Sequence, residues 1–506
     1  MIKLTPPQQI RIEFLLRICI GCISIGLVLL FLMTALRRLH YPYELEQLEG
    51  YMVLSVLHLA HAKTLYPAPN FNFLPYMYTP VYFYAAASLG KVMGISFTTL
   101  RTLSTLSTLG CFAGIYLLVW RETGRKLPAL AAAALYASAY PVCETWLDFG
   151  RVDSLYVLLM LLALYCTRRL HPVIAALAWV LVFQTKQSIL PIALIMLCFD
   201  FRRKGRTAAG LATFFAGLAA SIFALNHATH GWYSFYVFKV PAANADMVVR
   251  PAALFLFVNL FHPFGIACAM VAAAALLTRP RFDSRAPRFY LASLSIFVFS
   301  GWQMMHSGSS VNVLMPAYAM LAVLFGIALQ RLLAAYGGSA AQTAAVVVLG
   351  AALIQIAAGI YNPGDYVPPS GKRAALDAVM QQVKAVPGDV FAFQHPWYGM
   401  LAGKGEYTDN SALHDTLRAL KPGDAAALRH EVADAVCGGG IHALIFDAPD
   451  DMDDFSSMIK GGSGLHKHFT APQLIPGAMP ASRPAWILMA KTPNQQPAAS
   501  CSTSIH

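Results

Sequence analysis

Residues 14–36 read FLLRICIGCISIGLVLLFLMTAL, an apolar run of the length that a helix needs to cross the hydrocarbon core of a membrane. Residues 37–51, RRLHYPYELEQLEGY, follow directly and bring two arginines and three glutamates. The run is too long for the core of a signal peptide, and no small-residue cleavage site follows it. It therefore predicts a membrane anchor that is retained.

The composition of the whole chain continues this pattern. Of its 506 residues, 57% are hydrophobic and 12% are charged, and the mean hydropathy is +0.54. These values lie outside the range of ordinary soluble proteins and predict an α-helical polytopic membrane protein with about eleven spans. The expected spans are 14–36, 100–120, 128–143, 153–169, 172–185, 188–201, 209–226, 252–277, 289–305, 313–332 and 342–360.

Two apolar stretches do not fit a simple series of full spans. Residues 79–97 would reverse the sidedness of everything after them if they crossed, so we predict a juxtamembrane or re-entrant helix, with a tight helical pair left open. Residues 172–201 are too few for two full spans and too many for one. Here the sequence predicts two short helices that meet at Thr185-Lys186-Gln187.

Basic residues fix the expected orientation. They gather in alternate connections, so those connections and the N-terminus are predicted to face the cytoplasm of a bacterial inner (plasma) membrane. The acidic clusters Glu44/Glu46/Glu49 and Glu144/Asp148/Asp153 then both fall on the extracytoplasmic side. The net charge of +12 is mostly this topology signal, and no aromatic-interleaved basic stripe indicates nucleic acid.

A polar region begins after Tyr361, where the sequence holds 14 acidic and 11 basic residues. Short apolar runs at 390–393, 443–446 and 486–490 predict strands, and 372–384 and 424–436 predict helices. The expected domains are a membrane domain over 1–360 with its first outer loop at 37–99, a small extracytoplasmic (periplasmic) α/β domain over 361–491, and a disordered tail over 492–506.

The first loop has an acidic pair, Glu46 and Glu49, just before Gly50, then an aliphatic helix and Tyr66-Pro67. Further motifs are LDFGRVDSL at 147–155, TKQS at 185–188, the turn at 308–316 and LAGK at 401–404. The order of these motifs resembles the GT-C superfamily of polytopic membrane glycosyltransferases, especially the bacterial family related to dolichyl-phosphate-mannose protein mannosyltransferases and lipid A aminoarabinose transferases. His306 stands where relatives often carry Lys.

The resemblance implies an enzyme that moves a sugar from a polyprenyl-phosphate donor to a lipid, glycan or protein acceptor outside the cytoplasm. An Asp or Glu in the first outer loop is the catalytic base in that superfamily, which points to Glu46 or Glu49. The leaving phosphate calls for fixed cations, and Arg151 and Lys186 are the outer-side basic residues best placed for it. Asp153 is the third acidic candidate, to orient Arg151 or hold the acceptor, and His306, Asn312 and Tyr78 are candidates for substrate binding.

Each of these residues also has a plainer interpretation. Glu46 and Glu49 fit a solvated acidic turn, Arg151 and Asp153 a structural ion pair, Lys186 a side chain reaching the interface, and the aromatic run 71–84 an interfacial belt. His58 and His61 are weak candidates for metal binding beside interfacial polarity. We expect no cofactor; a divalent metal stays open, because protein mannosyltransferase relatives work without one whereas oligosaccharyltransferases require one.

Two other classes of function remain open. A flippase or transporter of lipid-linked sugars would also need polar groups in a helical bundle, but its charges should lie within the spans and its halves should repeat. In this chain the charges gather at the outer ends, and the sequence shows no repeat. A scaffold or receptor would explain the outer domain but would not account for the acidic loops.

Overall fold

The computed structural model describes residues 6–249, 253–277, 285–335, 339–438, 440–459, 473–476 and 485–490. The chain forms two compact units. The first contains residues 1–39, 101–221 and 246–367, and the second contains 40–100, 222–245 and 368–506. The expected tail over 492–506 lies outside the described residues.

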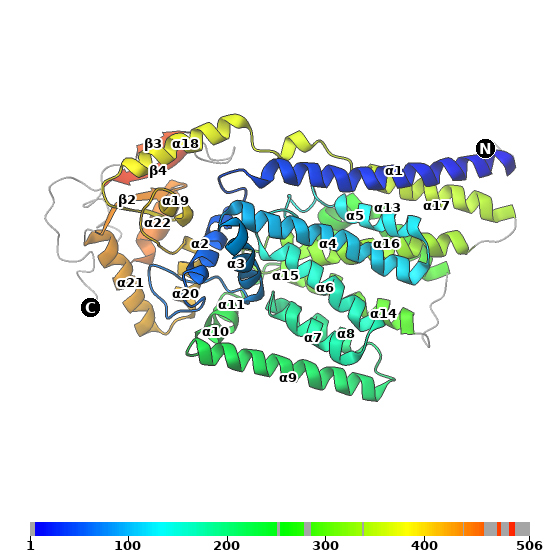
Figure 1. Ribbon diagram of the computed structural model, residues 1–506, viewed down its shortest axis with the longest axis horizontal. Helices are drawn as coiled ribbons and strands as arrows, with labels where there is room; N and C mark the ends of the chain where they lie inside the picture. Colours follow the sequence, from blue (N-terminus) through cyan, green and yellow to red (C-terminus); the bar gives the residue numbers. More distant parts are fainter. Residues whose placement is uncertain are drawn as a thin grey trace. The chain divides into compact units, whose positions relative to one another are not determined.

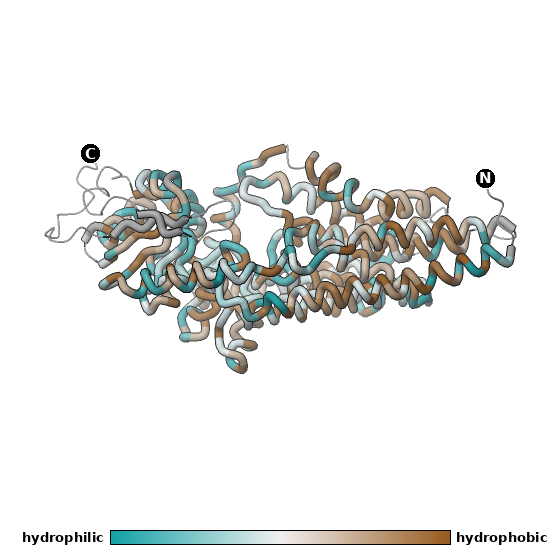
Figure 2. Tube along the Cα trace, turned by 90° about the horizontal axis from the view of Figure 1, so that it is seen from above, coloured by the Kyte–Doolittle hydropathy of each residue, from teal (hydrophilic) through white to brown (hydrophobic). Residues whose placement is uncertain are grey.

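Helices occupy every stretch that the sequence predicts as a span (Figure 1). In chain order they are α1 (Pro6–Leu39), α4 (Phe97–Thr123), α5 (Lys126–Ala137), α6 (Val152–Arg169), α7 (Pro172–Phe183), α8 (Leu190–Cys198), α9 (Lys204–Ala228), the π-helix η3 (Phe255–Phe261) with α13 (His262–Leu277), α14 (Arg285–Ser293), α15 (Ser295–Met304), α16 (Met315–Ala334) and α17 (Ser339–Ala357). Hydrophobic residues, brown in Figure 2, predominate along the long helices.

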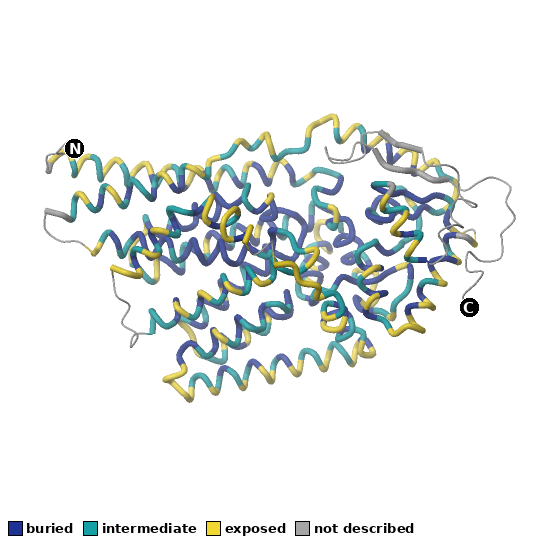
Figure 3. Tube along the Cα trace, turned by 180° about the vertical axis from the view of Figure 1, so that it is seen from behind, coloured by how far each residue is buried: buried dark blue, intermediate teal, exposed yellow. Residues whose placement is uncertain are grey.

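Five helical segments of the described chain are long and apolar enough to cross a membrane. They are Pro7–Leu39, Phe97–Thr123, Lys204–Ala228, Phe255–Leu277 and Val311–Ala334, and shorter apolar helices lie at Lys126–Ala137, Pro172–Phe183, Gln187–Cys198 and Ala341–Ala357. The helix positions thus agree with the sequence pattern, while eleven crossings stay a prediction. α9 carries exposed and half-buried residues over most of its length (Figure 3), as a lipid-facing helix would.

The centre of the first unit is α16, whose side chains are almost all buried. It packs against α5, α13 and α17, and α1 runs along α17 and α5 (Figure 1). A Cβ added at Gly326 would lie 2.8 Å from the Ala132 Cβ and the Pro128 carbonyl oxygen, so α16 and α5 approach closely only because this position has no side chain.

The two irregular stretches also form short helices. Residues 81–93 make α3 (Val81–Met93), whose 13 residues rise only about 20 Å and end at Gly94 with a φ of 76°. That length is less than the thickness of the hydrocarbon core, about 30 Å. Residues 172–201 make α7 and α8, separated by residues 184–186 and the 3₁₀ turn η1 (Gln187–Ile189). The break falls at Thr185-Lys186-Gln187, as the sequence predicts.

The second unit contains the first-loop helices α2 (Glu49–Ala60) and α3, a segment with α10 (Trp232–Ser234), the π-helix η2 (Phe235–Lys239) and α11 (Val240–Ala243), and the C-terminal region. The short 3₁₀ helices η4 (Val311–Leu314) and η5 (Pro363–Tyr366) belong to the first unit. The C-terminal helices are α18 (Ser370–Ala385), α19 (Pro396–Leu401), α20 (Asn410–Ala419), α21 (Pro422–Cys437) and α22 (Pro449–Met458).

These C-terminal helices accompany a four-stranded sheet with the order β1-β2-β4-β3. The strands are β1 (Asp389–Ala392), β2 (Ile441–Phe446), β3 (Gln473–Pro476) and β4 (Ala485–Ala490). β1 and β2 are parallel, so their carboxyl ends meet at one edge, whereas β4 is antiparallel to β2 and to β3. The residues that follow β1 and β2 therefore lie at the same edge of the sheet.

Candidate active site

Asp153, Lys186 and Asn312 meet in the first unit although they come from distant parts of the chain. Asp153 lies in the first turn of α6, where the helix dipole favours an acid. The Lys186 Nζ lies 2.7 Å from Asp153 Oδ1, and the Asn312 Nδ2 donates a hydrogen bond of 3.0 Å to the same oxygen. Three sequence-predicted site residues are therefore joined at one carboxylate.

This cluster is buried, and its charges are placed by local backbone breaks. Lys186 has an extended backbone conformation and lies at the break between α7 and η1. Its Nζ lies 5.5 Å from the centre of the Tyr156 ring, within range of a cation–π interaction. The second carboxylate oxygen of Asp153 is buried and accepts no hydrogen bond from the part of the chain that the structure describes. Buried ion pairs seldom add stability over apolar packing, which favours a functional reason for this one.

Arg151 is also buried, two residues before Asp153. Its guanidinium lies over the Trp146 ring, with the Cζ 5.1 Å from the ring centre. The turn that carries it is tightly bonded: Ser104 donates to the Arg151 carbonyl at 3.3 Å, and the Leu147 carbonyl accepts bonds from Thr108 and Ser154. Arg151 therefore projects from a rigid turn at the start of α6.

Asp148 takes part in a separate network that sequence analysis did not identify. Arg38, at the end of α1, donates to the Tyr140 hydroxyl and lies 3.4 Å from Asp148. The Tyr140 hydroxyl in turn lies 3.2 Å from both carboxylate oxygens of Asp148. This arrangement fixes the end of α1 to the turn before α6 and gives Asp148 a structural role.

The acidic turn, defined as residues 44–49, is closed by hydrogen bonds within itself. The Glu46 side chain accepts from the Leu48 N–H at 3.1 Å, and the Glu49 side chain accepts from the Leu45 N–H at 2.8 Å. The Glu49 N–H also donates to the Glu46 carbonyl at 3.1 Å. Glu49 is buried and Glu46 is half-buried, so the two carboxylates are not the mobile side chains of a fully solvated turn.

Glu44 is bonded to residues that follow β1 and β2. Its carboxylate is bonded to the His395 Nδ1, and the His395 Nε2 lies 3.2 Å from Asp447. His395 comes three residues after β1 and Asp447 directly after β2, so the parallel strands bring them to the same sheet edge. The Glu44 N–H donates to the Tyr398 hydroxyl at 3.3 Å. His395, Asp447 and Tyr398 have no motif in the sequence that would have singled them out.

The ionisation of this cluster follows from its burial and its charges. Burial raises the pKa of Glu44 to about 7, although His395 acts in the opposite direction. Burial lowers the pKa of His395, but Glu44 and Asp447 outweigh it and raise the value to about 10. A ring that donates to a carboxylate from each nitrogen carries a proton on both, and the raised pKa favours this imidazolium form of His395.

The His395 cluster predicts a pH dependence of stability. A histidine with a raised pKa stabilises the fold fully below its unfolded value of 6.5 and loses that contribution as the pH rises through about 10. In thermal unfolding scans from pH 6 to 10, we expect the advantage of the wild type over His395→Gln to shrink steadily. A constant difference across this range would contradict the assignment.

Gly50 is required by the packing around Glu44. A Cβ at this position would overlap the Glu44 carboxylate and lie 2.9 Å from the Trp397 Cβ. We expect Gly50→Ala to cost roughly 1 to 3 kcal/mol, as overpacking of a core does. The unfolding temperature should fall by several degrees, while Gly371→Ala on α18, where no described atom lies within 4 Å of the new Cβ, should not lower it. Equal midpoints for the two variants would argue against close packing at Gly50.

The remaining predicted candidates have local contacts. The Tyr78 carbonyl accepts a hydrogen bond from Tyr66 at 2.8 Å. The His306 ring packs edge-on against Trp302, and its backbone bridges to Met247. His58 stacks on Phe73 and lies 3.0 Å from Glu406, whereas His61 is an exposed residue at the end of α2. Within the described residues, no group of three or more His, Cys, Asp or Glu side chains is arranged to hold a metal ion.

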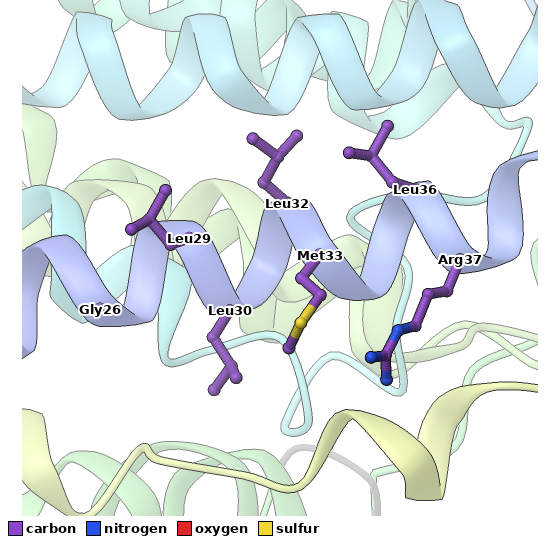
Figure 4. Close-up of a pocket in the computed structure, with 7 residues that line it drawn as sticks. All are labelled: Gly26, Leu29, Leu30, Leu32, Met33, Leu36 and Arg37. Carbon is purple, nitrogen blue, oxygen red and sulfur yellow. The ribbon is translucent and has the colours of Figure 1, made fainter.

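A hollow of about 680 Å³ lies along α1 and is shown in Figure 4. Leucines, Met33 and Gly26 line it, with Arg37 at one end. Its lining is almost entirely apolar and includes none of the site residues predicted from the sequence. We attach no catalytic role to this surface.

The sequence predicts one outer-face site that contains both acidic clusters. In the structure, Asp153, Lys186 and Asn312 belong to the first unit, and Glu44, Glu46 and Glu49 belong to the second. Each group is well ordered by its own contacts. Their convergence on one substrate stays a prediction.

The chain is similar to known glycosyltransferases in sequence and in structure. Residues 76–307 match the model of glycosyltransferase family 87. The structure of ArnT from Cupriavidus metallidurans bound to undecaprenyl phosphate superposes with a TM-score of 0.59 at 14% identity, covering 93% of this chain and 98% of ArnT. Its apo form gives a TM-score of 0.55 at 13% identity, covering 92% of this chain and 98% of ArnT.

An oligosaccharyltransferase from Archaeoglobus fulgidus is also similar in structure, with a TM-score of 0.51 at 12% identity over 96% of this chain and 75% of that enzyme. No curated protein matches the sequence. The predicted resemblance to polytopic GT-C membrane glycosyltransferases is confirmed by the family match and by the fold.

Proposed function

On the premise that residues 76–307 match glycosyltransferase family 87 and that the chain has a GT-C fold, we propose that the protein transfers a monosaccharide from a polyprenyl-phosphate donor to an acceptor at the extracytoplasmic face. The observation that carries this proposal is the buried Lys186–Asp153–Asn312 cluster. Asp153 and Lys186 lie within the matched segment, and Asn312 follows its end. The likeness to ArnT with undecaprenyl phosphate bound supports a lipid phosphate carrier.

The phosphate of the donor is bound by cations in this proposal. A lysine in a poorly hydrated site attracts a phosphate strongly, because little solvent screens the interaction. Asp153, which accepts a hydrogen bond from Asn312, holds Lys186 at a fixed place, and the Arg151 fork projects from the neighbouring turn to contact phosphate oxygens. His306 and Tyr78 are assigned to the sugar or lipid part of the donor. Asp153 thus positions the cation instead of exchanging protons with substrate.

The chemical step is a displacement at the anomeric carbon. The acceptor hydroxyl oxygen forms the new bond to that carbon, the bond from carbon to the phosphate oxygen breaks, and the polyprenyl phosphate leaves with the electron pair. The proton of the acceptor hydroxyl goes to the carboxylate of Glu49 or Glu46. Both carboxylates are held by main-chain N–H groups, which supports a fixed position for the base.

Reconstitution of the purified full-length protein in liposomes tests this function. The probes are undecaprenyl-phosphate mannose, glucose and arabinose, each with a radiolabelled sugar, supplied with total bacterial membrane lipid, periplasmic glycans or a periplasmic protein extract as acceptors. We expect one donor to release undecaprenyl phosphate and label one acceptor class. Movement of intact donor across the bilayer without acceptor would favour a flippase, and neither transfer nor movement with any donor would overturn the proposal.

A further inference from the structure

The acidic turn is anchored at one end by residues that follow β1 and β2. Its first residue, Glu44, is bonded through its side chain to His395 and through its backbone N–H to Tyr398. The His395 ring is stacked near Tyr398, with ring centres 5.4 Å apart, and is held on its far side by Asp447. All of these residues belong to the second unit, so the arrangement is internal to it.

Glu44 is placed to hold the turn and not to accept a proton from substrate. One carboxylate oxygen is bonded to His395. The other is buried, has no hydrogen-bond partner among the described residues, and points at Gly50, where an added Cβ would overlap it. With 4% of its side chain exposed, Glu44 offers little access to an acceptor hydroxyl. The carboxylate is enclosed between the histidine and the start of α2.

The fixed end lies close to both candidate bases. Glu46 is two residues from Glu44, and Glu49 is bonded back to the Leu45 N–H at 2.8 Å. The hydrogen bonds inside the turn restrict its backbone and side-chain torsions. The positions of both carboxylates therefore depend on the position of residue 44. A general base must lie within hydrogen-bond reach of the hydroxyl, so a small displacement of this turn reduces its efficiency strongly.

We propose that His395 is a positioning residue for sugar transfer: clamped by Asp447, it holds Glu44 and thereby fixes the turn that carries Glu46 and Glu49. The inference rests on the proposed function for its catalytic consequence. The charged groups that act on Glu44 are His395, Glu46, Glu49 and, from α18, Lys372. His395 itself faces Glu44 and Asp447. The role requires a ring that donates from both nitrogens, which glutamine cannot reproduce.

The catalytic arm of the test compares transfer by the wild type, His395→Gln, Glu44→Gln and the double variant, using the donor on which the wild type is active. We expect each single variant to lower kcat roughly 10- to 100-fold, as small misplacements of catalytic groups do, with KM for the donor changed less than about twofold. The double variant should be no slower than the slower single variant, because both changes break one interaction. His430→Gln is the matched control, since His430 pairs with Asp434 on an exposed part of α21.

The structural arm measures hydrogen exchange of residues 43–50 and does not depend on activity. We expect exchange in this segment to accelerate in His395→Gln while β1 and β2 exchange as in the wild type. Tyr398→Phe, which removes only the hydroxyl that accepts from the Glu44 N–H, gives a milder version if His395→Gln does not fold.

The two arms separate failure of this inference from failure of the proposed function. Unchanged exchange at 43–50 in the variants, or additive losses of kcat, would overturn the positioning role even in an active enzyme. Faster exchange confined to 43–50 in a protein without transferase activity would overturn the proposed function and retain His395 only as the anchor of this turn.

Discussion

Replacing Glu46 and Glu49 together by glutamine is expected to lower kcat for sugar transfer by roughly 10²- to 10⁴-fold, the contribution that a positioned general base makes. Glutamine keeps the shape of the side chain and a carbonyl oxygen that can accept the Leu48 or Leu45 N–H, so the turn should keep its hydrogen bonds. It cannot take the acceptor proton. The measurement is release of undecaprenyl phosphate from the active donor in liposomes.

The single variants Glu46→Gln and Glu49→Gln then show which of the two residues is the base. The variant with the loss nearer to that of the double variant identifies the residue that accepts the proton, and the other marks a residue that closes the turn. Gln47→Ala is the matched control, because Gln47 is the exposed residue between them. Full transfer by the double variant would exclude the acidic turn as the source of the base, whatever the role of the Lys186 cluster.

Lys186→Met is expected to weaken binding of undecaprenyl phosphate roughly 10- to 100-fold, because a hydrogen bond to a charged group contributes about 1.5 to 3 kcal/mol. It should also destabilise the protein by roughly 3 to 5 kcal/mol, since Asp153 would be left as a buried charge without its cation. Binding is measured by tryptophan fluorescence or native mass spectrometry with undecaprenyl phosphate, and stability by thermal unfolding in detergent.

A second variant separates the two effects of Lys186. Lys186→Met combined with Asp153→Asn removes the buried charge, so stability should recover while phosphate binding stays weak. Lys91→Met is the control for loss of a lysine, because Lys91 is exposed on α3. If the double variant regained binding together with stability, Lys186 would be a structural partner of Asp153 and not a phosphate ligand.

Much of the secondary structure could be predicted because its causes are local. Apolar runs of sufficient length must form helices in a membrane to satisfy their own backbone groups, which places α1, α4, α9 and α16. The break at Lys186 and the short helix after Pro80 follow from span length and from the sidedness of basic residues. Strands β1, β2 and β4 follow from short apolar runs bounded by turn residues.

The site could be predicted only in part. Lys186 and Asp153 stood out as charged residues at the ends of apolar runs, Asn312 was a candidate through the family resemblance, and the structure joins all three. In the sequence, Glu44 stood out only as a member of the first acidic cluster, and no feature pointed to His395 or Asp447. The contact between Glu44 and His395 joins residues 351 positions apart, and local pattern carries no information on such a pair.

The amino-acid sequence by itself determined that this is a membrane protein of apolar helices with a polar C-terminal region, and that few carboxylates are available for chemistry. Hydrophobic length and charge asymmetry are sufficient for these conclusions because they act residue by residue. Only the tertiary structure decided which polar groups are partners. A buried charge is stabilised by the groups that lie beside it in the folded chain. Lys186 contacts Asp153, and Glu44 of the acidic turn contacts His395, because segments distant in the sequence pack together.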